Sequence, residues 1–215
     1  MNGRVVAIVV AGGEGRRFGT PKQYALIGGR RVLDWSVEAA RTVAGTVVLV
    51  VPREAINDPS FHAAADMVVA GGETRSDSVR AGLAAAGDEA EVVVVHDAAR
   101  PLATAALFRA VVAAVEAGAD AAVPALPVTD TVKRVAAGRV LETVDRSDLV
   151  AVQTPQAFRL GLLRKAHEAG VVSTDDASLV EALGATVVVV PGEPRNMKLT
   201  SPDDLAVLEA WSPQA

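Results

Sequence analysis

The chain has 215 residues, no cysteine and a formal net charge of −5, and 50% of its residues are hydrophobic. A chain of this size can bury about 70% of its unfolded surface, so it can fold without disulfides or a structural metal. The lack of cysteine excludes disulfides, a thiolate nucleophile and a cysteine-based zinc site. The acidic balance argues against a general nucleic-acid binder.

The sequence carries no segment typical of export or membrane insertion. The N-terminal apolar run, residues 5–11, is shorter than a signal-peptide core and leads directly into a glycine-rich stretch. No apolar run reaches the ~20 residues that a membrane span needs. We therefore expect a cytoplasmic protein that binds neither membrane nor nucleic acid.

Short β-branched runs alternate with Ala- and Leu-rich stretches along the chain. Continuous apolar runs of this kind are typical of strands that helices cover on both faces. We predict strands over residues 5–10, 46–51, 67–69, 92–95, 121–123 and 186–190. We predict helices over residues 32–41, 77–86, 104–117, 160–169, 175–183 and 202–210. The alternation predicts an α/β fold with a doubly wound, mostly parallel sheet, in which ligands bind beyond the carboxyl ends of the strands.

Residues 127–150 interrupt this alternation. Two segments of alternating polarity flank Ala136-Ala137-Gly138, a pattern that predicts a β-hairpin. The hairpin does not have the composition of a core strand. We expect an arm that projects from the sheet and belongs to a single domain of residues 1–215.

A glycine-rich segment follows the first predicted strand. It reads Ala-Gly-Gly-Glu-Gly-Arg-Arg-Phe-Gly over residues 11–19, and Pro-Lys-Gln follows at 21–23. Glycines let backbone N–H groups approach phosphates, and Arg and Lys neutralise phosphate charge. The spacing matches neither the P-loop nor the dinucleotide-binding fingerprint. We interpret the segment as a triphosphate-binding loop rather than an ordinary turn between a strand and a helix.

The sequence His-Asp-Ala-Ala-Arg-Pro stands at 96–101, at the end of a predicted buried strand. Asp97 has the chemistry to hold Mg²⁺, and Arg100 has the charge to pair with an anion. The alternative is that Asp97 caps the next turn and pairs with Arg100. We favour the ligand-binding interpretation because the motif lies where the crevice is expected. We interpret His96 as structural.

Three further polar segments have two interpretations each. Residues 71–78 precede a helix, where free N–H groups and hydroxyls either cap the helix or bind a base or ribose. Residues 174–176 open another predicted helix, so capping explains them equally well. Residues 196–200 follow the last strand, and the lysine among them is either a solvated charge or a ligand contact.

Taken in order, these segments resemble the 2-C-methyl-D-erythritol 4-phosphate cytidylyltransferases, enzymes of the non-mevalonate pathway of isoprenoid synthesis. The resemblance runs from about residue 5 to residue 208. It also includes Asp-Thr-Val-Lys-Arg at 130–134, Val-Asp-Arg at 144–146 and Gln-Thr-Pro-Gln at 153–156. The chain departs from the family at Glu73, where members often have Asp, and at Gly12, where many have Ala.

The resemblance implies a Rossmann-like nucleotidyltransferase fold and a homodimer whose arm reaches the partner's active site. It implies that CTP and 2-C-methyl-D-erythritol 4-phosphate react, with Mg²⁺ as cofactor, to give CDP-methylerythritol and pyrophosphate. The implied catalytic residues are Arg17, Lys22, Arg146 and Lys198. The implied nucleotide contacts are Ala11, Gly12, Gly13, Gly15, Gly72, Glu73, Ser78, Asp97 and Ala98. The implied acceptor contacts are Asp97, Arg100, Thr131, Arg146, Thr174 and Lys198, and Asp97 is also the implied metal ligand.

Two other functions stay open. A cytidylyltransferase that uses ribitol 5-phosphate shares the glycine-rich loop and the motif at 96–98, and differs mainly in the arm. A non-catalytic nucleotide sensor on the same fold binds CTP without turnover. The cations at Arg17, Lys22 and Lys198 argue against the sensor, which has no need to keep them all.

Overall fold

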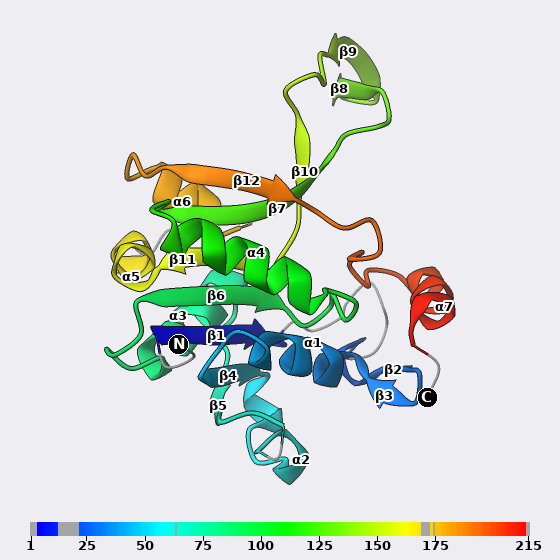
Figure 1. The fold of residues 1–215 in the computed structure, drawn as a ribbon. Helices are drawn as coiled ribbons and strands as arrows, with labels where there is room; N and C mark the ends of the chain where they lie inside the picture. Colours follow the sequence, from blue (N-terminus) through cyan, green and yellow to red (C-terminus); the bar gives the residue numbers. More distant parts are fainter. Residues whose placement is uncertain (1–3, 13–21, 63, 169–172, 174, 214–215) are drawn as a thin grey trace.

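The computed structural model describes residues 4–12, 22–62, 64–168, 173 and 175–213. Within these residues an eight-stranded sheet forms the centre, and helices cover both of its faces (Figure 1). The strand order is β10 (Val150–Val152), β7 (Ala121–Pro127), β11 (Gln156–Arg159), β6 (Val92–Asp97), β1 (Val5–Val10), β4 (Thr46–Val51) and β5 (Met67–Ala70), and β12 (Val187–Pro191) also pairs with β7.

The predicted mostly parallel α/β sheet is confirmed. Strand β1 runs parallel to β4 and β6, β4 runs parallel to β5, and β12 runs parallel to β7. The sequence did not reveal β10 and β11, which run antiparallel to their neighbours. Strand β10 has only three residues, and β11 begins with a buried glutamine, Gln156, so neither shows the long apolar run of strands such as β1 and β4.

Five helices pack on the two faces of the sheet. One face holds α1 (Val32–Arg41) and α4 (Ala105–Glu116), and the other holds α3 (Arg75–Ala85), α5 (Leu160–Glu168) and α6 (Ala177–Glu181). Strand β1 shows why both faces need cover. Ala7 packs in the cluster with α1 and α4, whereas the next residue, Ile8, packs in the cluster with α3, α5 and α6. Alternate side chains point to opposite faces of a strand, so an unbroken apolar run requires helices on both.

The order of the strands creates a switch point beside β1. The chain runs from β1 outward to β4 and β5, then returns to the other side of β1 to form β6. The ends of the two central strands are level, because Val10 pairs with Asp97. Crevices in doubly wound sheets form where the chain changes direction in this way, beyond the carboxyl ends of the strands.

A small third cluster anchors the C-terminal region next to these strand ends. It contains Ile27, Val32, Ala99, Leu199 and Leu208, all buried. The elements around it are the 3₁₀ helix η2 (Lys22–Tyr24), β2 (Leu26–Ile27), β3 (Arg30–Arg31) and α7 (Pro202–Trp211). Between β4 and β5 the chain forms η3 (Arg53–Ala55) and α2 (Pro59–His62), and α2 contacts β5. No helix in the described part of the chain is long and apolar enough to cross a membrane.

The predicted hairpin forms the arm. Its strands are β8 (Val132–Ala136) and β9 (Arg139–Val144), and they stand away from the sheet beyond β7 and β10 (Figure 1). The two turn residues, Ala137 and Gly138, have φ of 47° and 74°, as a two-residue hairpin loop requires. Three apolar arm side chains are more than half exposed: Val135 (54%), Val140 (60%) and Leu141 (61%).

Candidate active site

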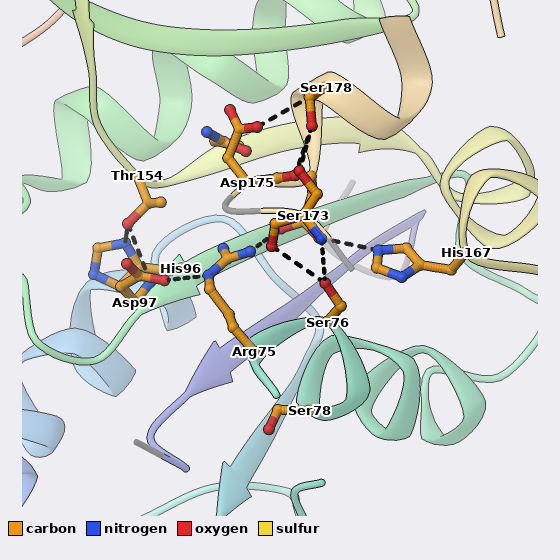
Figure 2. Close-up of polar contacts among 12 residues, drawn as sticks. Arg75, Ser76, Ser78, His96, Asp97, Thr154, His167, Ser173, Asp175 and Ser178 are labelled. Atoms are coloured by element: carbon orange, nitrogen blue, oxygen red, sulfur yellow. Dashed lines mark hydrogen bonds and ion pairs between the residues drawn. The ribbon is translucent and has the colours of Figure 1, made fainter. Parts of the chain in front are cut away.

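Asp97, the last residue of β6, lies at the centre of a polar cluster beside the switch point. Only 11% of its side chain is exposed. Its Oδ1 accepts a hydrogen bond from Arg75 Nε at 3.0 Å (Figure 2). Its Oδ2 accepts one from Lys198 Nζ at 2.6 Å. Burial opposes ionisation of Asp97, but Arg75 and Lys198 outweigh it and hold the pKa of this carboxyl well below its usual range. The carboxylate is therefore charged at neutral pH and shared between two cations.

A chain of hydrogen bonds fixes the backbone of Asp97. Its N–H donates to Thr154 Oγ1 at 3.0 Å. Thr154 Oγ1 lies 3.1 Å from His96 Nδ1, and His96 Nε2 lies 3.2 Å from the carbonyl oxygen of Arg100. Because a carbonyl only accepts, the imidazole proton belongs on Nε2, and the threonine hydroxyl donates to Nδ1. Burial lowers the pKa of His96 to about 4, so the ring is neutral and acts as a structural link.

Arg75 joins Asp97 to a second carboxylate. Its NH1 donates to Asp176 Oδ2 at 2.8 Å, and Asp176 Oδ1 lies 3.0 Å from Nε2 of buried His167. Burial opposes the charged guanidinium, but Asp97 and Asp176 outweigh it and raise the pKa of Arg75. The sequence analysis did not single out Arg75, Asp176 or His167. The signal available in the sequence was an arginine within the polar motif at residues 71–78.

Ser78, near the start of α3, lies close to Gly12. Thr74 caps the helix through a capping box with Asp77, so the capping interpretation is confirmed. The hydroxyl of buried Ser78 donates to the Thr74 carbonyl at 3.1 Å. A Cβ on Gly12 would lie 3.2 Å from Ser78 Oγ, and a Cβ on Gly72 would lie 2.2 Å from Asp77 Cβ. Glycine at position 12 therefore leaves room for the Ser78 hydroxyl, and glycine at position 72 leaves room for Asp77 within its own segment.

Two of the expected nucleotide contacts, Ala11 and Ala98, have backbone N–H groups that are already hydrogen-bonded within the protein. Ala11 and Ala98 are buried, and their N–H groups already donate to Val50 O at 2.8 Å and Val10 O at 3.0 Å. These two amides are part of the sheet and are not available to a phosphate. Glu73, in contrast, is exposed in the same region.

Residues 196–200 bring together the cations expected at the site. Lys22 Nζ donates to the Leu199 carbonyl at 2.8 Å, one residue beyond Lys198. Leu199 N–H donates to the Ala99 carbonyl at 2.8 Å, which holds this segment against the end of β6. Arg100 NH1 donates to the Asn196 carbonyl at 2.7 Å, whereas the ion pairs of Asp97 within the described residues are with Arg75 and Lys198. Burial lowers the pKa of Arg100, and its Nε is buried without a partner.

Other expected site residues lie elsewhere. Thr131 and Arg146 are exposed on and beside the arm, which projects away from the sheet (Figure 1). Within the described residues, Arg146 makes no side-chain hydrogen bond or ion pair. Gly13, Gly15, Arg17 and Thr174 fall outside the residues that the structure describes.

The carboxylates that could hold a metal are few. No group of three or more His, Asp or Glu side chains within the described chain is placed to bind a metal ion. Asp97 is the one candidate ligand from the sequence analysis, and a carboxylate offers about four lone-pair sites, of which Arg75 and Lys198 use two. Mg²⁺ often takes one or two protein carboxylates and fills its other positions with substrate phosphates and water. The residues present fit that mode of binding.

Comparison with known proteins identifies the family. The family model described as 2-C-methyl-D-erythritol 4-phosphate cytidylyltransferase matches residues 5–213. The chain belongs to this family. It is 47% identical over 216 residues to the cytidylyltransferase of that name from Rubrobacter xylanophilus, covering 95% of this chain and 93% of that one. It is 49% identical over 225 residues to a bifunctional enzyme IspD/IspF from Anaeromyxobacter dehalogenans, but spans only 58% of that protein's length.

Solved structures of the family have the same fold as this chain. The crystal structure of 2-C-methyl-D-erythritol 4-phosphate cytidylyltransferase from Thermus thermophilus is similar, with a TM-score of 0.82, 36% identity, and coverage of 95% of this chain and 96% of the other. A 4-diphosphocytidyl-2C-methyl-D-erythritol synthase from Anaerococcus prevotii has a TM-score of 0.84 at 28% identity, with 98% and 99% covered. The expected Rossmann-like nucleotidyltransferase fold is thereby confirmed.

Proposed function

We propose that this chain transfers CMP from CTP to 2-C-methyl-D-erythritol 4-phosphate, giving 4-diphosphocytidyl-2-C-methyl-D-erythritol and pyrophosphate in the non-mevalonate pathway. The observation that carries the proposal is the meeting of Asp97, Lys198 and the Lys22–Leu199 contact at the switch point of a chain that belongs to this family. This is the place where a doubly wound sheet binds a nucleotide.

The chemistry needs positioning and positive charge more than proton transfer. An oxygen of the acceptor phosphate attacks the α-phosphorus of CTP, and the bond to the pyrophosphate oxygen breaks. The acceptor phosphate is already ionised near neutral pH, so the reaction needs no general base. Negative charge gathers on the phosphates in the transition state, and fixed cations stabilise it. We assign this role to Lys22 and Lys198, together with Arg17 of the glycine-rich loop.

We also propose Mg²⁺ as the cofactor, with Asp97 as the protein ligand nearest to it. Bound Mg²⁺ neutralises phosphate charge and orients the phosphates of the nucleotide. The protein's part is to keep Asp97 ionised and fixed, which the hydrogen bonds from Arg75 and Lys198 support.

The proposal includes a homodimer in the cytoplasm, where nucleoside triphosphates are available. The exposed apolar side chains of the arm and its projection from the sheet support docking on a second copy. In such a dimer, Thr131 and Arg146 come from the neighbouring subunit to hold the acceptor phosphate, and Arg100 and Thr174 complete the acceptor site. The base and ribose lie near Gly72, Glu73 and Ser78.

An acceptor panel tests the function. The purified chain is incubated with CTP and Mg²⁺, and with methylerythritol phosphate, ribitol 5-phosphate or no acceptor, and pyrophosphate release is measured. Release that requires methylerythritol phosphate is the expected result. Faster release with ribitol 5-phosphate assigns the chain to the related reaction. CTP binding without release from any acceptor identifies a sensor and overturns the proposal.

A further inference from the structure

Arg75 lies between two carboxylates that come from distant parts of the chain. It is the first residue of α3, and its guanidinium bonds Asp97 at the end of β6 and Asp176 just before α6. The Asp176 side chain is only 1% exposed and is held on its other side by His167. The guanidinium is therefore fixed from both sides, and Figure 2 shows it between Asp97 and Ser173.

The two cations on Asp97 differ in how firmly they are held. The side chain of Lys198 is 40% exposed, and its ammonium bonds Asp97 Oδ2. The side chain of Arg75 is 22% exposed and is anchored by Asp176. A lysine has a flexible stem and one point charge, whereas an arginine has a rigid planar fork. Lys198 is thus the partner that can leave Asp97, and Arg75 is the partner that stays.

We propose that Arg75 is a positioning residue that holds the Asp97 carboxylate in place and keeps it charge-paired when Lys198 turns from Asp97 to a substrate phosphate. The proposal rests on the cytidylyl transfer proposed above. Removing one partner of a buried ion pair leaves an uncompensated charge, which is costly. Without Arg75, Asp97 would be left alone whenever Lys198 moved, so Asp97 would retain the lysine. Asp176 and His167 take part by fixing the other side of the guanidinium.

A double-mutant cycle between Arg75 and Asp97 tests the proposal. We expect Arg75→Met to lower kcat/KM about a hundredfold, the order of loss that a misplaced active-site group produces. If Arg75 acts through Asp97, the double variant Arg75→Met/Asp97→Asn is no slower than Asp97→Asn alone, within about threefold. Effects that multiply, so that the double variant falls about a further hundredfold, overturn the proposal.

A conservative variant separates charge pairing from packing. Arg75→Lys keeps a cation beside Asp97 but cannot reach both carboxylates, so we expect it to recover at least about tenfold of the activity lost in Arg75→Met. Equal activity of the two variants contradicts the proposal. The cycle repeated with Arg75→Lys also covers the case in which Arg75→Met does not fold.

Arg164 offers a matched control on α5. It bonds the carbonyl of Leu83 near the end of α3, and Asp88 and the carbonyl of Gly87 in the turn that leads to the amino end of β6. Arg164→Met therefore removes a comparable set of hydrogen bonds at the opposite edge of the sheet from Asp97. We expect this variant to lower the urea midpoint and to leave kcat/KM unchanged. A loss of kcat/KM equal to that of Arg75→Met shows that lost packing explains both and overturns the proposal.

Failure of the reaction and failure of the inference give different results. An inactive wild-type chain overturns the proposed function, and the Arg75–Asp97 pair is then tested in the same four proteins by urea unfolding. Non-additive midpoints support the pairing, and additive midpoints overturn it. An active wild-type chain with multiplicative kinetic effects keeps the function and removes Arg75 from it.

Discussion

The ammonium of Lys22 donates a 2.8 Å hydrogen bond to the backbone carbonyl of Leu199, the residue next to Lys198. Lys22 is thereby held against the segment that carries Lys198, and Lys198 bonds Asp97. The contact also links the residues that follow the glycine-rich loop to those that follow β12. A phosphate bound between them meets positive charge from both ends of the chain.

Lys22→Ala is expected to leave the fold intact and to lower kcat/KM about a hundredfold, the cost of losing about 3 kcal/mol of transition-state stabilisation. Steady-state pyrophosphate release measures the loss, and circular dichroism checks the fold. Lys165→Ala, on the exposed side of α5, is the matched control and should retain full activity. Arg17→Ala should behave like Lys22→Ala. Wild-type kcat/KM in either site variant removes that residue from the triphosphate site.

Turnover is expected to require a divalent cation, supplied mostly through the nucleotide. Few carboxylates lie near Asp97, so the free protein should bind Mg²⁺ weakly and the CTP-bound protein should bind it well. Excess EDTA should abolish pyrophosphate release, and added Mg²⁺ should restore it. Calorimetric titration of Mg²⁺ with and without CTP checks the order of binding. Full turnover in EDTA, or tight metal binding without nucleotide, contradicts this prediction.

The folded protein is expected to lose stability in mild acid because His96 resists protonation. The folded-state pKa is depressed to about 4 by burial, whereas the unfolded value is about 6.5. Between these pH values the unfolded chain therefore binds more protons than the folded chain. The stability that neutral His96 contributes is fully present above about pH 6.5 and falls by about 2 kcal/mol by about pH 5. Urea unfolding at about pH 7.5 and about pH 5 measures the loss.

His96→Gln removes the titrating group, so its stability should depend less on pH over the same range, even if it starts lower. His62→Gln is the control, since His62 is exposed at the end of α2, and it should keep the wild-type dependence. A pH dependence in His96→Gln as steep as that of the wild type assigns the acid sensitivity to other groups.

The sequence predicts the layers of the fold better than its return strands. Runs such as 46–51 are apolar throughout, and the burial of both faces follows from that pattern alone. Strand β11 is different, because Gln156 and Arg159 stand at its ends and its burial depends on neighbours far along the chain. The hairpin of the arm was predictable because its polarity alternates around a turn that carries a glycine.

The site shows the same division between local and long-range signals. Asp97 and Lys198 each stand in a recognisable motif, so they could be singled out before their contact was known. The role of Arg75 depends on Asp176, 101 positions along the chain. No local pattern indicates such a pair. Thr74 and Asp77 offered a sufficient capping explanation for the whole segment, which concealed the arginine between them.

The last prediction is that Arg146 acts in trans across a dimer. The arm exposes Val135, Val140 and Leu141, and a hairpin alone is only marginally stable in water. Docking on a symmetry mate would bury these side chains in an isologous interface and bring the exposed Arg146 to the partner's site, where a guanidinium can hold a phosphate with two hydrogen bonds. If the arm instead serves its own subunit, Arg146 makes at most a surface ion pair worth ~0–1 kcal/mol.

A mixing experiment distinguishes the two arrangements. Arg146→Ala and Lys22→Ala homodimers should each be nearly inactive. When the two variants are refolded together, about half of the dimers are mixed, and each mixed dimer has one site with both defects and one with neither. Activity should then recover to about a quarter of wild type. If Arg146 acts in cis, every site keeps one defect and mixing restores nothing. Wild-type chain mixed with either variant controls for refolding yield, and a monomer at assay concentration would exclude the trans arrangement without any mixing.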